Sequence, residues 1–415
     1  MFQHKASLEL IAASEKEHAM AVYVFLPYPA SGPVNPTLAI AQGLVDRGQT
    51  VIYYLPEAWA ETVRATGALF RPYESRLAPS LSTKEPQQAQ ESRQVLPQIL
   101  EQIRADAPDV IVHDPFSAWT SIIVRILAVQ AVFLHSSYPM NEHFNVAKLM
   151  ADLPGASAHV AAMREIIDKE NAALAAVCGS YHVAPVEYQQ LASCAAQLNI
   201  VFIPRAFQPA GETFDERYLF IGPSLRPRSK TPVFPFERLS AERPLLYISL
   251  GSLFTSQPTF FRQCFEAFGK LSWQVVLSVG NQVQVESLGP IPENFLLAAY
   301  VPQLEILPRA CAFVTHGDVN SAMESLYCGV PMVAIPQETM DQAVTARRLV
   351  ELGLSIALSK AEVTAEMLCR AVERLVNDEA IHQKVGEMQR LAHQAGGYQC
   401  AVEALMRFAH EYVSR

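Results

Sequence analysis

The sequence predicts an α/β protein made of two domains, each built on a parallel β-sheet. Short apolar runs alternate with helical segments along most of the chain, and strands that take turns with helices form parallel sheets covered on both faces. The alternation occurs in two series, on either side of a stretch rich in prolines and charges at 223–243. A chain of 415 residues also exceeds what one hydrophobic core usually serves, so two domains are expected.

The first series begins with a predicted strand, AVYVFLP at 21–27. The following PTLAIAQGLVDRG has helical spacing of its apolar residues, with Asn35 as the expected N-cap, Pro36 as the first helical residue and Gly48 at the end. TVIYYLP at 50–56 is the next predicted strand, which completes a βαβ unit. The alternation continues with a helix in EAWAETVRATG, the strand DVIVHD, a helix in SAWTSIIVRILAV and the strand AVFLHSS.

The pattern changes between 138 and 190, where polar loops and helical stretches such as HVAAMREIIDKENAALAAVC replace the strands. We expect this segment to be an insertion that shapes a pocket. Two strand-like runs, NIVFIP and RYLFIGP, follow it. The second series runs through PLLYISLGS, WQVVLSVG, FLLAAYVPQ, CAFVTHG and VPMVAIPQ, with helices between them and the amphipathic helices LCRAVERLVND and YQCAVEALMRFAHEYV towards the end.

Domain bounds follow from these changes of pattern. The prolines and charges of 223–243 cannot form a core element, so this stretch is the predicted interdomain linker. The predicted parts are a leader segment at 1–19, an N-terminal Rossmann-like domain at 20–222, the linker at 223–243, a C-terminal Rossmann-like domain at 244–395 and a C-terminal helix at 396–415 that packs back on the first domain.

Charge, cysteine usage and hydropathy argue against several functional classes. A formal net charge of −9 argues against nucleic acids and anionic membranes as partners, because their binding proteins concentrate Lys and Arg. The seven cysteines include no CxxC pair and no Cys/His pair with metal-ligand spacing, so free thiols in a reducing compartment are expected. No apolar stretch approaches the roughly 20 residues of a transmembrane helix, and the first residues lack the apolar core of a signal peptide. We therefore expect a cytoplasmic protein without a transmembrane segment.

A histidine and several small polar residues separate an apolar run from a helix start in FVTHGDVNSAMESLYCGVPMVAIPQ, at 313–337. In open parallel sheets, ligands bind at the carboxyl ends of strands. The free backbone N–H groups and the dipole of a helix N-terminus favour an anion, and His316, on the turn before the helix, adds a donor. A structural interpretation stays open, in which Ser321 and Glu324 form a capping box and His316 is an ordinary hydrogen-bonding residue.

The whole stretch HGDVNSAMESLYCGVPMVAIPQETMDQAVTARRLVELGLSIAL closely resembles the donor-binding signature of nucleotide-sugar glycosyltransferases with the GT-B fold. The nearest resemblance is to bacterial macrolide and natural-product enzymes of the UDP-glycosyltransferase superfamily. SLGS, YVPQLEILP and VNPTLAIAQGLVDRGQTV match as well, and the resemblance is weakest over 74–94 and 138–190. It implies two Rossmann-like domains that face a central cleft, with the acceptor in the N-terminal domain and the nucleotide sugar in the C-terminal domain.

The resemblance also implies roles for individual residues. The residues expected near the diphosphate are Ser252, His316, Gly317, Asn320 and Ser321. Val301 and Gln303 would flank the base, and Glu324 would accept hydrogen bonds from the ribose. Asp341 and Gln342 would hold the transferred sugar, and Tyr28 and Phe116 would contact the acceptor. Neutral donors and a helix dipole stabilise the charge that grows on the leaving diphosphate, so no metal is required. No cofactor is expected beyond the UDP- or dTDP-sugar co-substrate.

One departure from the family concerns the base. Relatives carry a histidine that acts as general base where this chain has Pro33, and proline cannot accept a proton. Asp114 matches the carboxylate that orients this histidine, although it also suits the N-cap of a helix at 116–129. Three routes stay open: Asp114 acts directly or through a water, His113 or His135 substitutes, or the acceptor needs little help. General-base help is commonly worth about 10²- to 10⁴-fold.

A second departure is Asp318, which stands where relatives usually have glycine beside the diphosphate. At about 4 Å, a carboxylate and a phosphate charge repel by roughly 1 to 4 kcal/mol, depending on the effective dielectric. A side chain that points outward would instead serve the helix N-terminus.

The function expected from these observations is that of an inverting, metal-independent glycosyltransferase. It would move a sugar from a UDP- or dTDP-sugar to a small, apolar natural product. The two departures leave an alternative open, a catalytically degenerate relative that binds a nucleotide or a partner as an accessory protein.

Overall fold

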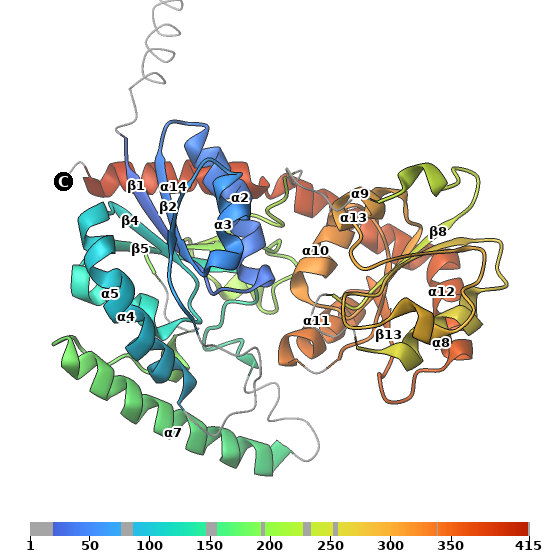
Figure 1. Cartoon of the computed structure of the whole chain (residues 1–415), viewed down its shortest axis with the longest axis horizontal. Coiled ribbons are helices and arrows are strands. Elements are labelled where there is room, and N and C mark those ends of the chain that lie inside the picture. Colours follow the sequence, from blue (N-terminus) through green and yellow to red (C-terminus); the bar gives the residue numbers. More distant parts are fainter. Residues whose placement is uncertain are drawn as a thin grey trace, which may run out of the picture.

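The computed structural model describes residues 20–75, 86–146, 156–191, 196–226, 234–251, 256–337 and 339–413. The predicted leader at 1–19, part of the predicted linker and the candidate Ser252 lie outside these residues. Within them the chain forms two parallel sheets, each flanked by helices (Figure 1). This arrangement confirms the predicted fold class.

The first sheet has seven strands in the order β3-β2-β1-β4-β5-β6-β7, and each neighbouring pair is parallel. Its strands are β1 Val22–Leu26, β2 Thr50–Leu55, β3 Leu69–Pro72, β4 Val110–His113, β5 Gln130–His135, β6 Leu198–Val201 and β7 Tyr218–Phe220. The helices of this part are α2 Ser31–Val45, α3 Ala60–Arg64, α4 Gln87–Asp106, α5 Ala118–Leu127 and α7 Ala156–Ser180, with short 3-10 turns η1 Glu57–Trp59, η2 Tyr188–Gln190 and η3 Gly211–Thr213.

The second sheet has six strands in the order β10-β9-β8-β11-β12-β13, again all parallel. Its strands are β8 Leu245–Ser249, β9 Gln274–Ser278, β10 Phe295–Ala298, β11 Ala312–Thr315, β12 Met332–Ala334 and β13 Ser355–Ala357. The helices are α8 Pro258–Phe268, α9 Gln303–Ile306, α10 Val319–Tyr327, α11 Met340–Glu351, α12 Ala365–Asn377, α13 Glu379–Gln394 and α14 Gly397–Val413, with 3-10 turns η4 Phe236–Arg238, η5 Val285–Leu288 and η6 Leu307–Arg309.

The start of α2 corrects the sequence prediction. Its N-cap is Ala30, so the helix begins five residues before Pro36, and Asn35 is not its cap. Proline lacks the N–H that would bond to the carbonyl four residues earlier, which is that of Gly32. That carbonyl accepts instead from the Asn320 side-chain nitrogen at 3.3 Å. The Asn320 side chain of α10 therefore supplies the hydrogen bond to the Gly32 carbonyl that the backbone of Pro36 cannot donate.

The prediction lacks four further strands and α-helices: β3, β13, the 20-residue helix α4 and the 16-residue helix α13. β3 is short and carries Arg71 and Pro72, and α4 contains Pro97, so neither shows a clean period. In α4 the buried residues still recur along one face: Ala89, Glu91, Ser92, Val95, Leu96, Ile99, Leu100 and Ile103. This face packs against α5 and α7.

The last helix, α14, crosses from the C-terminal half of the chain and lies along the N-terminal sheet region (Figure 1). It packs against α2. Its apolar residues Ala401, Val402, Leu405, Phe408 and Ala409 belong to the same buried cluster as strands β1, β2 and β4. The end of the chain is thus part of the first core.

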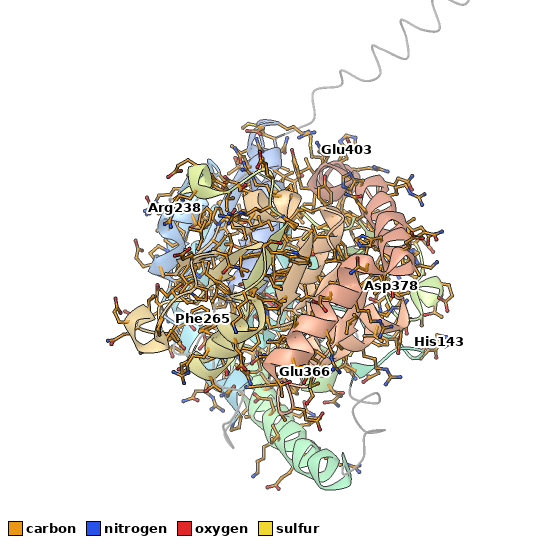
Figure 2. The ribbon with its side chains drawn as sticks, turned by 90° about the vertical axis from the view of Figure 1, so that its right-hand side faces the viewer. His143, Arg238, Phe265, Glu366, Asp378 and Glu403 are labelled. Atoms are coloured by element: carbon orange, nitrogen blue, oxygen red, sulfur yellow. The ribbon has the colours of Figure 1, made fainter. Side chains whose placement is uncertain are left out.

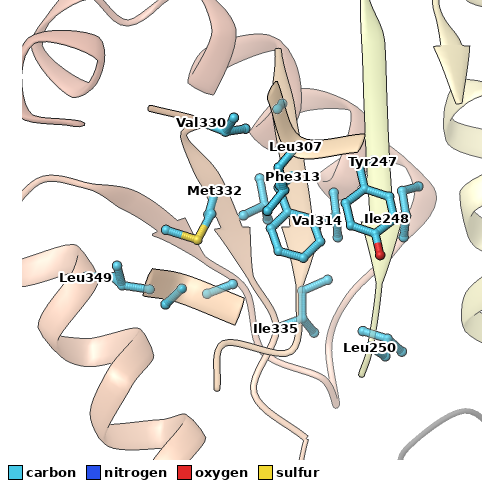
Figure 3. Close-up of a cluster of buried hydrophobic side chains, with 14 of the residues drawn as sticks. Tyr247, Ile248, Leu250, Leu307, Phe313, Val314, Val330, Met332, Ile335 and Leu349 are labelled. Atoms are coloured by element: carbon cyan, nitrogen blue, oxygen red, sulfur yellow. The ribbon is translucent and has the colours of Figure 1, made fainter. Parts of the chain in front are cut away.

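The core of the second sheet supports the strands that lead to the site described below. Tyr247 of β8 and Phe313 of β11 stack with ring centroids 4.8 Å apart and planes 7° apart (Figure 3). Both rings are fully or almost fully buried. This stack keeps β8 and β11 in register beneath the loops at their carboxyl ends.

The outer face of the C-terminal half is formed by helices such as α12 and α13, with Glu366 and Asp378 pointing outward (Figure 2). Asp378 is the N-cap of α13 and accepts from the N–H groups of Ala380 and Ile381 at 3.1 and 3.2 Å. Among the described residues, no helix is both long and apolar enough to cross a membrane.

Candidate active site

The candidate site lies where the order of strands reverses in the second sheet. β8 and β11 are neighbours there, and the loops that follow such a pair leave in opposite directions, which opens a ligand position. Gly251 follows β8, and His316 follows β11. The first sheet has the equivalent point between β1 and β4, where Tyr28 and Asp114 stand.

His316 packs directly on the backbone of Gly251. The imidazole is 7% exposed, and a Cβ added to Gly251 would lie 2.6 Å from its Nε2 atom. Gly251 also has a φ of +77°, a conformation that favours glycine. Gly317 has a φ of +76° and its N–H donates to the Thr315 hydroxyl at 3.3 Å. Both glycines are thus required by the turn that presents His316.

The cap of α10 is Asp318, which corrects the predicted capping box. The Asp318 Oδ1 atom accepts from the Ser321 N–H at 3.1 Å, and Ser321 is the third helical residue rather than the cap. The same Oδ1 lies 3.4 Å from His316 Nε2. Asp318 therefore caps the helix N-terminus, which is one of the two roles considered for it from the sequence. Its carboxylate also lies beside the His316 imidazole.

Glu324 is buried on the next turn of α10 and bonds to another predicted site residue. Its Oε2 atom accepts from Gln303 Nε2 at 2.7 Å, and Gln303 Oε1 accepts from the Tyr247 hydroxyl at 3.2 Å. Val301, half-buried, precedes α9, which begins at Gln303. The structure thus brings Val301, Gln303 and Glu324 together at one end of the candidate site.

Asp341 and Gln342 form the first turn of α11 but have different surroundings. Gln342 is 3% exposed and its Oε1 accepts from the Gln337 N–H at 2.8 Å, which holds the preceding loop. Asp341 Oδ1 accepts a short hydrogen bond from the Ser137 hydroxyl of the N-terminal domain. Burial raises the pKa of the Asp341 carboxyl to about 6, and the nearby Asp318 carboxylate raises it too, whereas the Ser137 hydroxyl and the Val319 N–H favour the ionised form.

The carboxyl ends of the two sheets meet at the N-termini of two helices. The Asn320 side chain, in the first turn of α10, donates to the Gly32 carbonyl, in the first turn of α2. Helix N-termini carry partial positive charge. The positive N-terminal ends of α2, from the N-terminal domain, and of α10, from the C-terminal domain, therefore both lie at this contact.

Asp114 holds the loop between β1 and α2. Its carboxylate accepts from the Phe116 N–H at 2.8 Å and from the Tyr28 N–H in a short hydrogen bond. Ser117, not Asp114, is the N-cap of α5, so the predicted helix-capping role is wrong. Burial raises the pKa of the Asp114 carboxyl to about 6, against the opposing effect of the backbone N–H groups around it.

The predicted acceptor residues stand close to Asp114. The Tyr28 side chain is half-buried, and burial together with the Asp114 and Glu91 carboxylates raises the pKa of its phenol. Phe116 is 39% exposed. An exposed aromatic ring at the carboxyl end of a sheet suits contact with an apolar ligand.

His113 and His135, the two candidate substitutes for the base, lie inside the N-terminal domain. They are 1% and 2% exposed, and both rings contact Phe133. His113 Nδ1 lies 2.9 Å from the Thr120 hydroxyl, and His135 Nε2 lies 3.4 Å from Asn199 Oδ1. Burial lowers the pKa of each to about 4. Neither imidazole is placed to meet a substrate from solution.

No group of three or more His, Cys, Asp or Glu that could hold a metal ion occurs within the described part of the chain. The thiol of Cys328, at the end of α10, lies near Glu324, and burial followed by this carboxylate raises its pKa to about 11. It is therefore a neutral thiol at physiological pH and no nucleophile.

Sequence reasoning missed three residues of this site: Ser137, Tyr247 and Gly251. In the sequence, nothing distinguishes Tyr247 from other aromatic residues in strands, or Ser137 from other polar residues that follow a strand. Gly251 lies in the motif SLGS, where a glycine directly after a strand in a Rossmann-like domain signals a close backbone approach. The other two become visible only when the partners Gln303 and Asp341 are known.

Relatives in sequence connect this geometry to a chemistry. The family described as "Erythromycin biosynthesis protein CIII-like, C-terminal domain" matches residues 262–400. The chain is 37% identical over 397 residues to the NDP-glycosyltransferase YjiC of Bacillus licheniformis, which covers 92% of this chain and 96% of the relative. It is 32% identical over 417 residues to demethyllactenocin mycarosyltransferase of Streptomyces fradiae, which covers 95% and 88%.

Solved structures give the same result. The calicheamicin glycosyltransferase structure is similar with a TM-score of 0.79 and 28% identity, over 96% of this chain and 99% of the other. A glycosyltransferase of kitacinnamycin is similar with a TM-score of 0.82 and 28% identity, over 94% and 99%. The resemblance predicted from the signature at 316–358 is confirmed.

We predict that Gly251→Ala disturbs ligand binding through His316, because the new methyl group would meet the imidazole. The control is Gly48→Ala, since Gly48 follows α2 with a φ of +76° and has no atom within 4 Å of an added Cβ. Both variants should lose about 1 to 2 kcal/mol of stability from the left-handed backbone, as measured by urea unfolding. Only Gly251→Ala should weaken UDP binding in calorimetry, by about tenfold or more. Equal affinities in the two variants would contradict the placement of His316.

We also predict a pH-dependent effect of Asp341→Asn. Ionisation of Asp341 is harder in the folded chain, where its pKa is about 6, than in the unfolded chain, where it is near 3.8. The charged form therefore costs stability above about pH 6 and has no effect below about pH 4. Asp341→Asn should be more stable than the wild type by about 1 to 3 kcal/mol at about pH 8, and this gain should vanish towards pH 4. Urea unfolding at both pH values checks this, and a gain independent of pH would contradict it.

Proposed function

The chain belongs to the nucleotide-sugar glycosyltransferases with the GT-B fold, of the macrolide and natural-product type, and from this premise we propose its reaction. It transfers a sugar from a UDP- or dTDP-sugar to a small, largely apolar natural product. The transfer inverts the anomeric centre and requires no metal ion. The observation that carries this proposal is His316, packed on Gly251 at the strand reversal and beside the N-terminus of α10.

In the proposed complex, the diphosphate lies at the start of α10. His316 Nε2 and the first-turn N–H groups near Asn320 and Ser321 donate to its oxygens. They are hydrogen-bond donors aimed at the position where negative charge grows as the leaving group departs. Ser252 would approach a phosphate as well, although it lies outside the described residues.

The rest of the donor follows from the neighbours of α10. Glu324 accepts from the ribose hydroxyls, and Gln303 with Val301 flanks the base. The hydrogen bond from Gln303 to Glu324 supports this assignment because it fixes the carboxylate on the base side. Asp341 and Gln342 hold the hydroxyls of the transferred sugar at the start of α11.

The acceptor approaches from the N-terminal domain, between Tyr28 and Phe116. Its nucleophilic oxygen forms a bond to the anomeric carbon while the bond from that carbon to the phosphate oxygen breaks, and the diphosphate leaves with the electron pair. The proton of the acceptor passes to a base. Burial lowers the pKa of His113 and His135 to about 4, so both are weak bases. Asp114 is as buried as they are, so we assign it this role only through a water, or the acceptor is acidic enough to need little help. The raised pKa of Asp114, about 6, suits a carboxylate base.

A second candidate function is favoured by one observation. Two N–H groups of the first turn of α10, those of Ser321 and Val319, already face the chain's own carboxylates, Asp318 and Asp341. Together with Pro33 in the base position, this favours a catalytically degenerate accessory protein without turnover.

The test is incubation of the purified protein with UDP-glucose or dTDP-glucose in the presence of EDTA, with a panel of phenolic and macrolide acceptors. The proposal expects nucleotide release that depends on the acceptor and a product of inverted configuration. Release that requires an added divalent cation would overturn the metal-independent reaction. Tight nucleotide binding without release of sugar from any donor would identify the accessory function instead.

Asp318→Gly should strengthen donor binding, because it removes a carboxylate that lies 3.4 Å from His316 Nε2. Loss of repulsion worth about 1 kcal/mol or more corresponds to a roughly fivefold or larger fall in the donor KM. The control is Asp378→Gly, which removes the same kind of cap from α13 on the outer face (Figure 2). Both should lose only a few tenths of a kcal/mol in stability. A donor KM that rises in Asp318→Gly alone would show that Asp318 assists binding.

A further inference from the structure

One face of α11 is attached to the N-terminal domain. Asp341, Thr345 and Arg348 are spaced i, i+4 and i+7, so they lie on the same side of the helix. Thr345 accepts from the Tyr138 hydroxyl at 3.2 Å. Arg348 donates to the backbone carbonyls of Phe207 and Ala206 at 2.9 and 3.1 Å. The helix that begins with the sugar-binding pair is therefore part of the interface between the domains.

Ser137 extends this interface to the carboxylate itself. It stands two residues after β5 in the N-terminal domain, and its hydroxyl donates to Asp341 Oδ1. The Val319 N–H, at the start of α10, also favours the ionised Asp341. Three segments from two domains thus converge on one side chain.

The position of Ser137 is fixed by its neighbour. Tyr138 is 4% exposed. Its ring stacks on Phe207 with centroids 6.2 Å apart and planes 16° apart, and meets the edge of Phe144 at 6.0 Å. This packing of the Tyr138 ring within the N-terminal domain holds the adjacent Ser137 hydroxyl in place.

A carboxylate that accepts from sugar hydroxyls acts best when its orientation is set before the ligand arrives. We propose that Ser137 is a positioning residue that orients Asp341 for the donor sugar, so that the acceptor domain completes the sugar subsite of the donor domain. This inference rests on the proposed function. It implies that the donor sugar is held fully only while the two domains are in contact.

Other charged groups also face this region. Asp318, the cap of α10, adds negative charge near Asp341, and His316 lies 3.4 Å from Asp318. On α11 itself, Arg348 and Glu351 form an ion pair at 3.6 Å. From the N-terminal domain come the uncharged hydroxyls of Ser137 and Tyr138. A test of Ser137 must therefore leave these charges unchanged.

The first test compares Ser137→Ala with Ser137→Thr, which keeps the hydroxyl, and with Tyr138→Phe, which removes the neighbouring interdomain hydrogen bond to Thr345. Loss of a hydrogen bond to a charged group should raise the KM for the donor about 10- to 100-fold in Ser137→Ala. Its kcat should fall less, and Ser137→Thr should restore most of the donor KM. Tyr138→Phe should change the donor KM less than about twofold. Equal changes in Ser137→Ala and Tyr138→Phe would show a merely structural role.

The second test needs no turnover. Because Ser137 stabilises the ionised carboxylate, Ser137→Ala should shift the unfolding equilibrium constant at least about fivefold more at about pH 8 than at about pH 4. Tyr138→Phe should shift it equally at both values. A pH-independent effect of Ser137→Ala would overturn the coupling. If the wild type turns over donor but the donor KM of Ser137→Ala is unchanged, only this inference fails. If the wild type turns over no nucleotide sugar, the proposed function fails, and the donor role of Ser137 with it.

Discussion

The contact between the carboxyl ends of the two parallel sheets brings the donor-side and acceptor-side residues of the site together. At this contact the Asn320 side chain donates to the Gly32 carbonyl, and the Ser137 hydroxyl donates to Asp341. The helices α2 and α10 both begin here, and the positive ends of their dipoles favour an anion between the domains. The chain places two carboxylates of its own, those of Asp318 and Asp341, beside the start of α10. A donor diphosphate would enter a site whose positive elements are already in position.

The alternation of apolar and amphipathic segments is enough to predict two parallel sheets, whereas the anion site at the histidine before α10 stays a prediction. Local sequence patterns give wrong helix starts and caps where a residue far away in the sequence forms the decisive hydrogen bond. Pro36 looks like the first residue of a helix, yet α2 extends before it because Asn320 satisfies the Gly32 carbonyl that proline leaves free. Ser321 and Glu324 have capping-box spacing, yet Asp318 is the cap and Glu324 bonds to Gln303. The interdomain bonds join residues 204 and 288 positions apart, which no periodicity can show.

The two departures from the family signature have different structural consequences. Pro33 stands where the family resemblance places the base, and Asp114, the carboxylate expected to orient that base, holds the β1–α2 loop through the Tyr28 N–H. The loop is thus tied to β4 without a histidine. Asp318 stands where relatives usually have glycine, and it caps α10. We propose that both departures act on affinity and rate rather than on the architecture.

Calorimetric titration with UDP and with uridine, for the wild type and for His316→Ala, tests the central claim most directly. The claim is that the start of α10 and His316 hold a diphosphate. It predicts that UDP binds much more tightly than uridine, and that His316→Ala weakens UDP by about tenfold or more while uridine is unaffected. Equal affinities of the wild type for UDP and uridine, or no effect of His316→Ala on UDP, would contradict it.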